Sequence, residues 1–179
     1  MMMPLEEFDL VIFGATGNAG WAVCNHLALK QRGEPVKWAV AGRNRAKLEA
    51  LVAKLDGTSV PAIVIADSGD EASLLSMAMR AKVVFSAAGP YSLIGEPVLA
   101  ACIEAGAHYA DITGEVNWVG AMEKKYGVRA TEKGVCIASL CGYDCIPSEV
   151  SIFAARAELK LPPKREELFF AESVVSIKV

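Results

Sequence analysis

Six short apolar segments alternate with longer segments of helical character along the 179-residue chain, and this alternation restricts the possible folds more than any other feature. Several of these segments are apolar throughout, which is typical of strands that are buried on both faces of a parallel sheet. We therefore predict an α/β fold, with a doubly wound, mostly parallel Rossmann sheet in the strand order 3-2-1-4-5-6. The predicted strands span residues 10–13, 36–41, 62–66, 82–87, 108–112 and 135–140.

The segments between these strands carry start and stop signals of helices. Asn44 and Asp70 each precede a helical pattern and are suitable N-caps for helices over residues 45–55 and 71–81. Pro97 fits the first turn of a helix that Gly106 would end. The remaining helices are predicted over residues 115–134 and 147–159.

Three glycines at fixed spacing follow the first predicted strand, in the segment FGATGNAG. Gly14 would permit a tight turn, Gly17 would let the backbone approach a pyrophosphate, and Gly20 would allow close packing of helix on strand. The N-terminus of the following helix offers free N–H groups and a positive dipole end, which suit an anion. A tight turn that serves the fold alone is the alternative, but the position in the first βα unit favours cofactor binding. The cofactor-binding residues predicted here are Gly14, Ala15, Thr16, Gly17, Asn18, Ala19 and Gly20.

The end of the second strand favours NADP over NAD as the cofactor. NAD sites place Asp or Glu there for the ribose 2′-hydroxyl, whereas NADP sites commonly use Arg for the 2′-phosphate. The segment VAGRNRAKLE has no acid at the strand end and places Arg43 there, with Asn44 and Lys47 as further donors. A solvated loop arginine is the alternative interpretation of Arg43.

Later strand ends supply the other predicted cofactor contacts. Asp67 follows the third strand, where it either accepts a hydrogen bond from the adenine amine or forms a turn with the next two residues. After the fourth strand, Ala88 and Gly89 are small enough for the nicotinamide ribose to lie against the backbone, and Pro90 stiffens the turn. Tyr91 either points toward the crevice, where it could stack on a ligand or donate a proton, or has only a structural packing role.

Catalytic residues stay unassigned at this stage. Glu115 and Asp144 are acid–base candidates if burial raises their pKa values, but capping of a helix by Glu115 and formation of a turn by Asp144 are favoured. The five cysteines lack the spacing of metal ligands, so we predict buried or incidental thiols and no metal site. The polar groups that follow the fifth and sixth strands are Asp111, Thr113, Glu115, Cys141, Tyr143 and Asp144.

Composition excludes several classes of function. A formal net charge of -3, with acidic and basic residues interspersed, gives no basic surface for nucleic acid or acidic membranes. No apolar run approaches the roughly 20 residues that a transmembrane helix needs, and the N-terminus lacks the basic region of a signal peptide. We therefore expect a cytoplasmic protein whose partners are a dinucleotide and an unidentified small-molecule substrate.

Several motifs together resemble the saccharopine dehydrogenase-like oxidoreductases along nearly the whole chain. The resemblance implies an N-terminal NAD(P)-binding Rossmann domain, followed by a substrate and dimerisation domain built on a mixed sheet. We accordingly expect the Rossmann domain over residues 1–160, and a linker plus the first strand of a truncated second domain over residues 161–179. That final strand could instead add to an edge of the sheet, and a strand left without a partner could pair with another chain in a homodimer. The motifs are FGATGNAG, AGRNRAKL, AAGPYSLIGEPVLAACIEAGAHYADITGE and CGYDCIPSE.

The expected function is that of an NADP-dependent oxidoreductase. It would transfer a hydride to or from a small carbonyl, imine or alkene substrate, and this chain would be mainly the cofactor-binding half. The alternative is a non-catalytic dinucleotide-binding or interaction module, which the truncated second domain and the missing acid–base pair favour.

Overall fold

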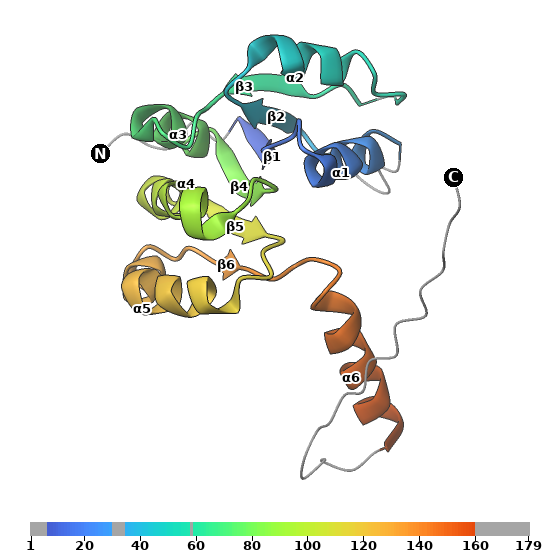
Figure 1. The fold of residues 1–179 in the computed structure, drawn as a ribbon, viewed down its shortest axis with the longest axis vertical. Helices are drawn as coiled ribbons and strands as arrows, with labels where there is room; N and C mark the ends of the chain where they lie inside the picture. Colours follow the sequence, from blue (N-terminus) through green and yellow to red (C-terminus); the bar gives the residue numbers. More distant parts are fainter. Residues whose placement is uncertain (1–6, 30–34, 58, 160–179) are drawn as a thin grey trace.

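One parallel sheet of six strands forms the centre of the molecule, in the order β3-β2-β1-β4-β5-β6 (Figure 1). The computed structural model describes residues 7–29, 35–57 and 59–159, and the predicted fold class and strand order are confirmed. The strands are β1 (Phe8–Phe13), β2 (Trp38–Gly42), β3 (Ala62–Ile65), β4 (Ala81–Ser86), β5 (His108–Asp111) and β6 (Ile137–Ala138). The helices are α1 (Asn18–Leu29), α2 (Arg45–Val52), α3 (Glu71–Ala78), α4 (Tyr91–Ala105), α5 (Val116–Glu132) and α6 (Ile146–Leu159).

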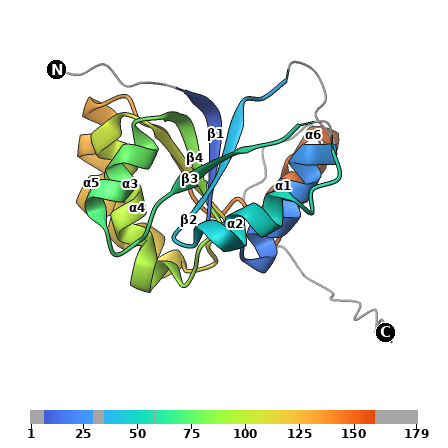
Figure 2. The ribbon, with the colours of Figure 1, turned by 90° about the horizontal axis from the view of Figure 1, so that it is seen from above.

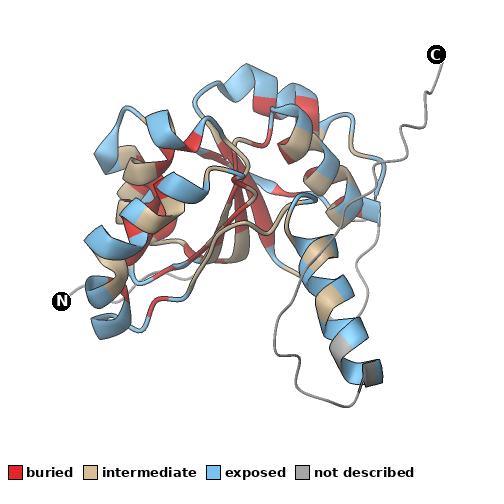
Figure 3. Cartoon of the chain, turned by 60° about the horizontal axis from the view of Figure 1, so that its bottom comes forward, coloured by how far each residue is buried: buried red, intermediate tan, exposed pale blue. Residues whose placement is uncertain are grey.

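Both faces of the sheet are covered by helices, as the apolar strand sequences predict. Helices α1 and α2 lie on one face, and α3, α4 and α5 lie on the other (Figure 2). In β1, Ile12 packs into the core on the α1 side, whereas Val11 and Phe13 pack into the core on the α3–α5 side. All three side chains are buried, which explains why this strand is apolar at successive positions. Buried residues, drawn in red, gather along the central strands and on the helix sides that face them (Figure 3). Helix α6 extends away from the sheet beyond β6.

The predicted helix caps at Asn44 and Asp70 are confirmed. The Asn44 side chain accepts a hydrogen bond from the backbone N–H of Lys47, and the Asp70 side chain accepts bonds from the first turn of α3. Gly106 ends α4 in the left-handed conformation, with φ of +80°, as predicted. Pro147 lies in the first turn of α6, also as predicted.

The prediction for Pro97 is wrong, because α4 begins at Tyr91 and Pro97 lies inside the helix. Proline in a helix interior removes one backbone hydrogen bond and normally ends or kinks the helix. Here α4 is fixed by tertiary packing, since one of its faces is buried against the sheet and the neighbouring helices, through Val98, Leu99 and Ile103 among others. Packing that depends on distant residues thus outweighs the local signal.

The last strand is much shorter than the predicted segment 135–140. Only Ile137 and Ala138 pair with β5, because the chain then turns at Leu140, whose φ is +64°. The segment after β6 bonds to the end of β5 through side-chain and turn contacts instead of continuing the ladder. The predicted final strand and linker over residues 161–179 lie outside the described residues, so the domain boundary stays a prediction.

Candidate cofactor site

The glycine loop between β1 and α1 is required by the fold at two of its three glycines. Gly14 has φ of +78°, and a Cβ added to it would lie 2.8 Å from the Cβ of Ala88. A Cβ added to Gly20 would lie 2.4 Å from the Gly14 carbonyl oxygen and 2.7 Å from the Ala15 Cα. Gly14 and Gly20 therefore serve the turn and the packing of α1 on β1.

Gly17 differs from the other two glycines, because the fold does not need it to be glycine. A Cβ added there would have an ordinary contact, 3.4 Å from the Gly14 carbonyl oxygen, and its φ lies outside the left-handed region. Gly17 is exposed at the N-terminus of α1, where the first N–H groups of the helix have no intrahelical acceptor. The interpretation of the loop as a turn for the fold alone explains Gly14 and Gly20, but it leaves Gly17 unexplained.

A cavity of about 330 Å³ lies at the carboxyl ends of the central strands. Residues from four separate loops line it, and each of these loops contains a residue that the sequence predicted as a cofactor contact. Ligands of open α/β sheets bind at this edge, where the strand order reverses between β1 and β4. The predicted cofactor residues that line the cavity are Gly14, Thr16, Arg43, Asp67 and Ala88, and its other lining residues are Phe13, Gly42, Ala66, Ser68 and Ile94.

A second cavity, of about 640 Å³, lies between α1 and the α2 region and shares Thr16 with the first. Gly17 and Asn18 line it from the glycine loop, and Lys47 and Lys54 line it from the other side. Sequence reasoning missed Lys54. The sequence did offer a signal: Lys54 follows Lys47 by seven residues, which is about two turns of an α-helix and places both lysines on the same side.

Arg43 is exposed at the end of β2 and is available for an anionic ligand. None of the ion pairs among the described residues involves its guanidinium. Asn44 is less available, because its Oδ1 accepts the hydrogen bond from Lys47 N at 3.0 Å and so caps α2.

Asp67 forms the turn that was one of its two predicted roles. Its Oδ1 accepts a hydrogen bond from Gly69 N at 3.0 Å, and its own N–H donates to Ser73 Oγ at 3.0 Å. The half-buried Asp67 also lines the first cavity, so the adenine contact stays a prediction.

The remaining predicted cofactor residues do not line the first cavity. Ala15 is fully buried in the core beneath the loop, so its side chain is not available to a ligand. Ala19 lies in the first turn of α1. Gly89 and Pro90 are exposed, joined by a cis peptide bond, in the loop that leads from Ala88 into α4.

Tyr91 packs inside the protein and does not face the crevice. Its side chain is buried, its hydroxyl donates to the Ser86 carbonyl oxygen at 2.8 Å, and its ring packs against Trp118 at 5.6 Å between centroids. Burial raises the pKa of Tyr91 to about 12. Of the two predicted roles, packing is the one that these contacts favour.

The segment DITGE, which begins at the last residue of β5, forms hydrogen bonds to the segment after β6 and to the start of α4. The fully buried Asp111 accepts hydrogen bonds from Thr113 N at 3.0 Å, from Leu140 N at 3.1 Å and from Ser139 Oγ at 3.0 Å. Burial, together with the charge of Asp111, raises the pKa of the Tyr109 phenol, so the phenol stays neutral. Sequence reasoning placed Asp111 only as a candidate polar group and missed its role in fixing the segment after β6.

The raised pKa on which the acid–base role of Glu115 was conditional is not found. Hydrogen bonds from the Ser92 side chain and from the Ser92 and Tyr91 backbone hold its pKa below the usual range, although partial burial opposes them. Glu115 occupies the N-cap position of α5, but its carboxylate does not cap that helix and instead reaches the first turn of α4. Glu115 thus caps a helix, but the helix is α4 and not α5, at whose N-terminus Glu115 lies. The turn role of Asp144 stays a prediction.

Comparison with known proteins assigns the family. The model of the saccharopine dehydrogenase NADP binding domain matches residues 10–137. The chain belongs to this family. The NADP-binding domain matched here contains the glycine loop and all the strand ends that line the cavity, so NADP is confirmed as the cofactor type of the family.

Relatives of this NADP-binding domain are considerably longer proteins. The human saccharopine dehydrogenase-like oxidoreductase is 39% identical over 170 residues, which are 89% of this chain and 40% of that protein. The lipid droplet localized protein of Caenorhabditis elegans is 39% identical over 153 residues, which are 83% of this chain and 36% of that protein. The chain thus spans about two fifths of the length of these relatives.

Solved structures confirm the fold of the NADP-binding domain. Saccharopine dehydrogenase (L-Glu forming) from Saccharomyces cerevisiae matches with a TM-score of 0.62 at 15% identity, over 86% of this chain and 32% of that one. Among the described residues, the structure contains no helix that is both long and apolar enough to cross a membrane.

Proposed function

We propose that this chain is the cofactor-binding part of an NADP-dependent oxidoreductase that acts on a small carbonyl, imine or alkene. One observation carries the proposal: Gly14, Thr16, Arg43, Asp67 and Ala88 come from four loops and line one cavity at the switch point of the sheet. The family membership and the oxidoreductase relatives support it.

Each part of the site has a proposed task. The backbone N–H groups at the start of α1 bind the pyrophosphate, with Gly17 leaving room for its approach. Arg43 binds the 2′-phosphate through its planar, permanently charged fork. Ala88, Gly89 and Pro90 form the wall on the nicotinamide side. When bound, the cofactor supplies or accepts the hydride, and the protein orients it.

Titration calorimetry with NADPH and NADH tests this function. We expect NADPH to bind with a dissociation constant below 1 mM, on the order of the micromolar range, and more tightly than NADH. Arg43→Ala should weaken NADPH binding by about tenfold or more and leave NADH nearly unchanged, because only NADPH carries the 2′-phosphate. Arg45→Ala is the matched control, since Arg45 is an exposed arginine two residues away that pairs with Glu49. Failure of both nucleotides to bind would refute the proposal, and a preference for NADH would refute the role of Arg43.

A non-catalytic dinucleotide-binding module is the second candidate. The lowered pKa of Glu115 favours it, because a carboxylate that stays ionised is a poor general acid. An assay of hydride transfer separates the two candidates. It uses imino acids, ketones and enoyl compounds, and it compares this chain with a chain extended to the length of the relatives. Turnover by the extended chain supports the oxidoreductase, and NADPH binding without turnover in both supports the module.

A further inference from the structure

The first turn of α4 is capped by a carboxylate from a distant loop. Glu115 Oε1 accepts a hydrogen bond from Tyr91 N at 2.6 Å, and Glu115 Oε2 accepts one from Ser92 N at 3.0 Å. The residue at the N-cap position of α4 is Pro90, which has no side-chain acceptor to offer. Glu115 therefore supplies both the hydrogen bonds and the negative charge that the N-terminus of this helix favours.

Glu115 is itself held firmly to the end of β5. Its backbone N–H donates to Thr113 Oγ1 at 3.0 Å, and Thr113 N in turn donates to Asp111 Oδ1 at 3.0 Å. Asp111 and Thr113 are both buried. Because its backbone is held in this way, only the side chain of Glu115 has to lose conformational freedom when the carboxylate binds α4.

The residues that immediately precede α4 are those proposed to contact the nicotinamide side of the cofactor. Ala88 lines the cavity and lies against Gly14, and Gly89 and Pro90 connect it to Tyr91. Glu115 does not line the cavity itself. A contact that fixes the first turn of α4 therefore also fixes the exit direction of this loop, without touching the ligand.

We propose that Glu115 is a positioning residue that holds the loop over residues 88–90 in place for the nicotinamide end of the cofactor. This inference rests on the proposed function, because it assumes that a dinucleotide occupies the cavity. The DITGE segment then has a role besides stabilising the fold, because it connects the loop after β4 to the end of β5.

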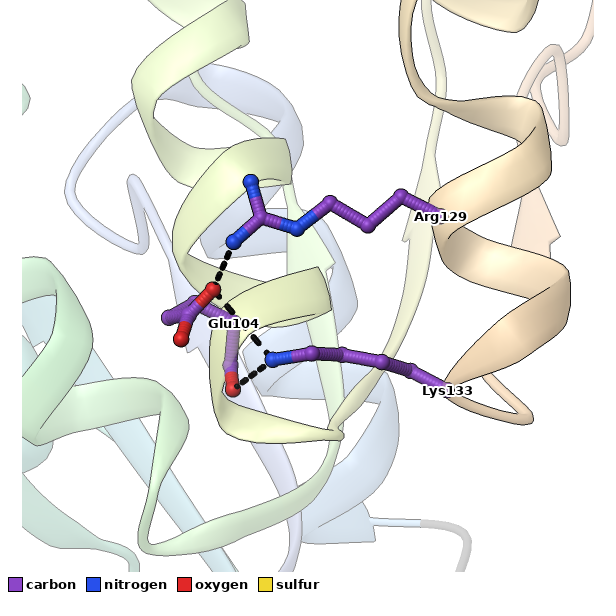
Figure 4. A network of polar contacts seen from close by, with 3 residues as sticks. All are labelled: Glu104, Arg129 and Lys133. Atoms are coloured by element: carbon purple, nitrogen blue, oxygen red, sulfur yellow. Dashed lines mark hydrogen bonds and ion pairs between the residues drawn. The ribbon is translucent and has the colours of Figure 1, made fainter.

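Glu104 provides a matched control for Glu115. Its carboxylate also joins α4 to a neighbouring segment, through Arg129 and through Lys133 Nζ at 3.2 Å, both from the C-terminal end of the α5 region (Figure 4). Glu104 lies in the last turn of α4, at the end of the helix far from Tyr91. Removing its charge takes away an ion pair of the same helix far from Tyr91, so the loop before the helix is expected to stay in place.

Two ligands distinguish positioning from general stabilisation. NADPH carries the nicotinamide ring, whereas 2′-phospho-ADP-ribose has the same phosphates and adenine without the ring. We expect Glu115→Gln to weaken NADPH binding by about fivefold and to change 2′-phospho-ADP-ribose binding by less than about twofold, as loss of a charge-assisted bond to one loop implies. Glu104→Gln should change neither affinity by more than about twofold. Hydrogen exchange at the Tyr91 and Ser92 amides should accelerate only in Glu115→Gln.

The outcomes that overturn the inference are distinct from those that overturn the function. Equal weakening of both ligands by Glu115→Gln, or no weakening of either, would refute the positioning role while leaving the cofactor site intact. Failure of the unaltered protein to bind either ligand would refute the proposed function, and the inference with it. If Glu115→Gln does not fold, Glu115→Asp serves instead. It keeps the charge but is one methylene too short to reach both amides, so the same preferential loss of NADPH binding is expected.

Discussion

Ala88 lies so close to Gly14 that a Cβ on the glycine would approach the Ala88 Cβ to 2.8 Å. This contact joins the loop after β1 to the loop after β4, the two strands between which the strand order reverses. Both residues line the first cavity, and a side chain at position 14 would clash with Ala88.

Gly20→Ala should destabilise the protein, because its Cβ would lie 2.4 Å from a backbone oxygen that cannot move without shifting the loop. We expect a loss of about 1–3 kcal/mol in the free energy of unfolding, measured by urea denaturation. A loss below about 0.5 kcal/mol would contradict the packing role of this glycine.

Gly17→Ala should weaken NADPH binding without destabilising the protein much. Its Cβ fits without a close contact, so the free energy of unfolding should change by less than about 1 kcal/mol. NADPH binding should weaken by about tenfold, because the methyl group occupies the space through which the pyrophosphate approaches the backbone. Calorimetry on the folded variant measures this, and unchanged affinity would argue that the phosphate binds elsewhere.

Asp111→Ala should be among the most destabilising substitutions at this edge of the sheet. It leaves three donors, Thr113 N, Leu140 N and Ser139 Oγ, without their acceptor. We expect a loss of about 3 kcal/mol by urea denaturation. Ser139→Ala removes one of these donors and should cost only about 1 kcal/mol. Equal effects of the two substitutions would show that Asp111 does not organise the segment after β6.

Thermal stability should fall in acid. The Lys133 hydrogen bond, and then the Lys133 and Arg129 charges, hold the pKa of Glu104 below its usual value. The pKa of Glu96 is lowered in the same way by Lys125 and Tyr126. A carboxyl group with a lowered pKa in the folded state stabilises the protein above its unfolded pKa of about 4.3 and loses this contribution as the pH falls through the folded value.

The midpoint of thermal unfolding should therefore stay nearly constant from about pH 7 to pH 5 and decrease below about pH 4.3. The acid decrease should be shallower in Glu104→Gln, which has no charge to lose. Because these groups are exposed, added salt should reduce the difference between the variant and the unaltered protein. An identical pH profile for both would show that the Glu104 ion pairs contribute nothing.

Alkylation should distinguish the cysteines. Burial raises the pKa values of Cys24 and Cys102 to about 12, whereas Cys136 is exposed. Only the thiolate is nucleophilic, so iodoacetamide at about pH 8 should label Cys136 in the native protein and reach Cys24 and Cys102 only after unfolding. Peptide mapping by mass spectrometry measures this. Native labelling of Cys102 as fast as Cys136 would contradict the burial of α4 on the sheet.

Local signals explain why the sheet order and the main cavity residues were predictable. Apolar strands, capping residues and glycine spacing act over a few neighbouring residues, and Arg43 and Asp67 follow strands whose ends must meet at one edge. Pro97 inside α4 and the two-residue β6 were not predictable, because tertiary packing and the Asp111 bonds decide them. The reach of Glu115 to Tyr91 spans 24 residues, and the sequence of DITGE does not indicate which helix it caps.

The brevity of β6 affects how this sheet meets other molecules. Of the sheet's last strand, only Ile137 and Ala138 are available for ladder hydrogen bonds, and the left-handed turn at Leu140 carries the chain away from the line of the strand. Short edges that bend away resist the addition of foreign strands. Within the described residues, the apolar side chains of Ile146, Val150 and Phe153 on α6 are exposed. Self-association of the domain at this end would therefore depend on side-chain packing more than on backbone pairing, and it would be sensitive to single polar substitutions on one helix.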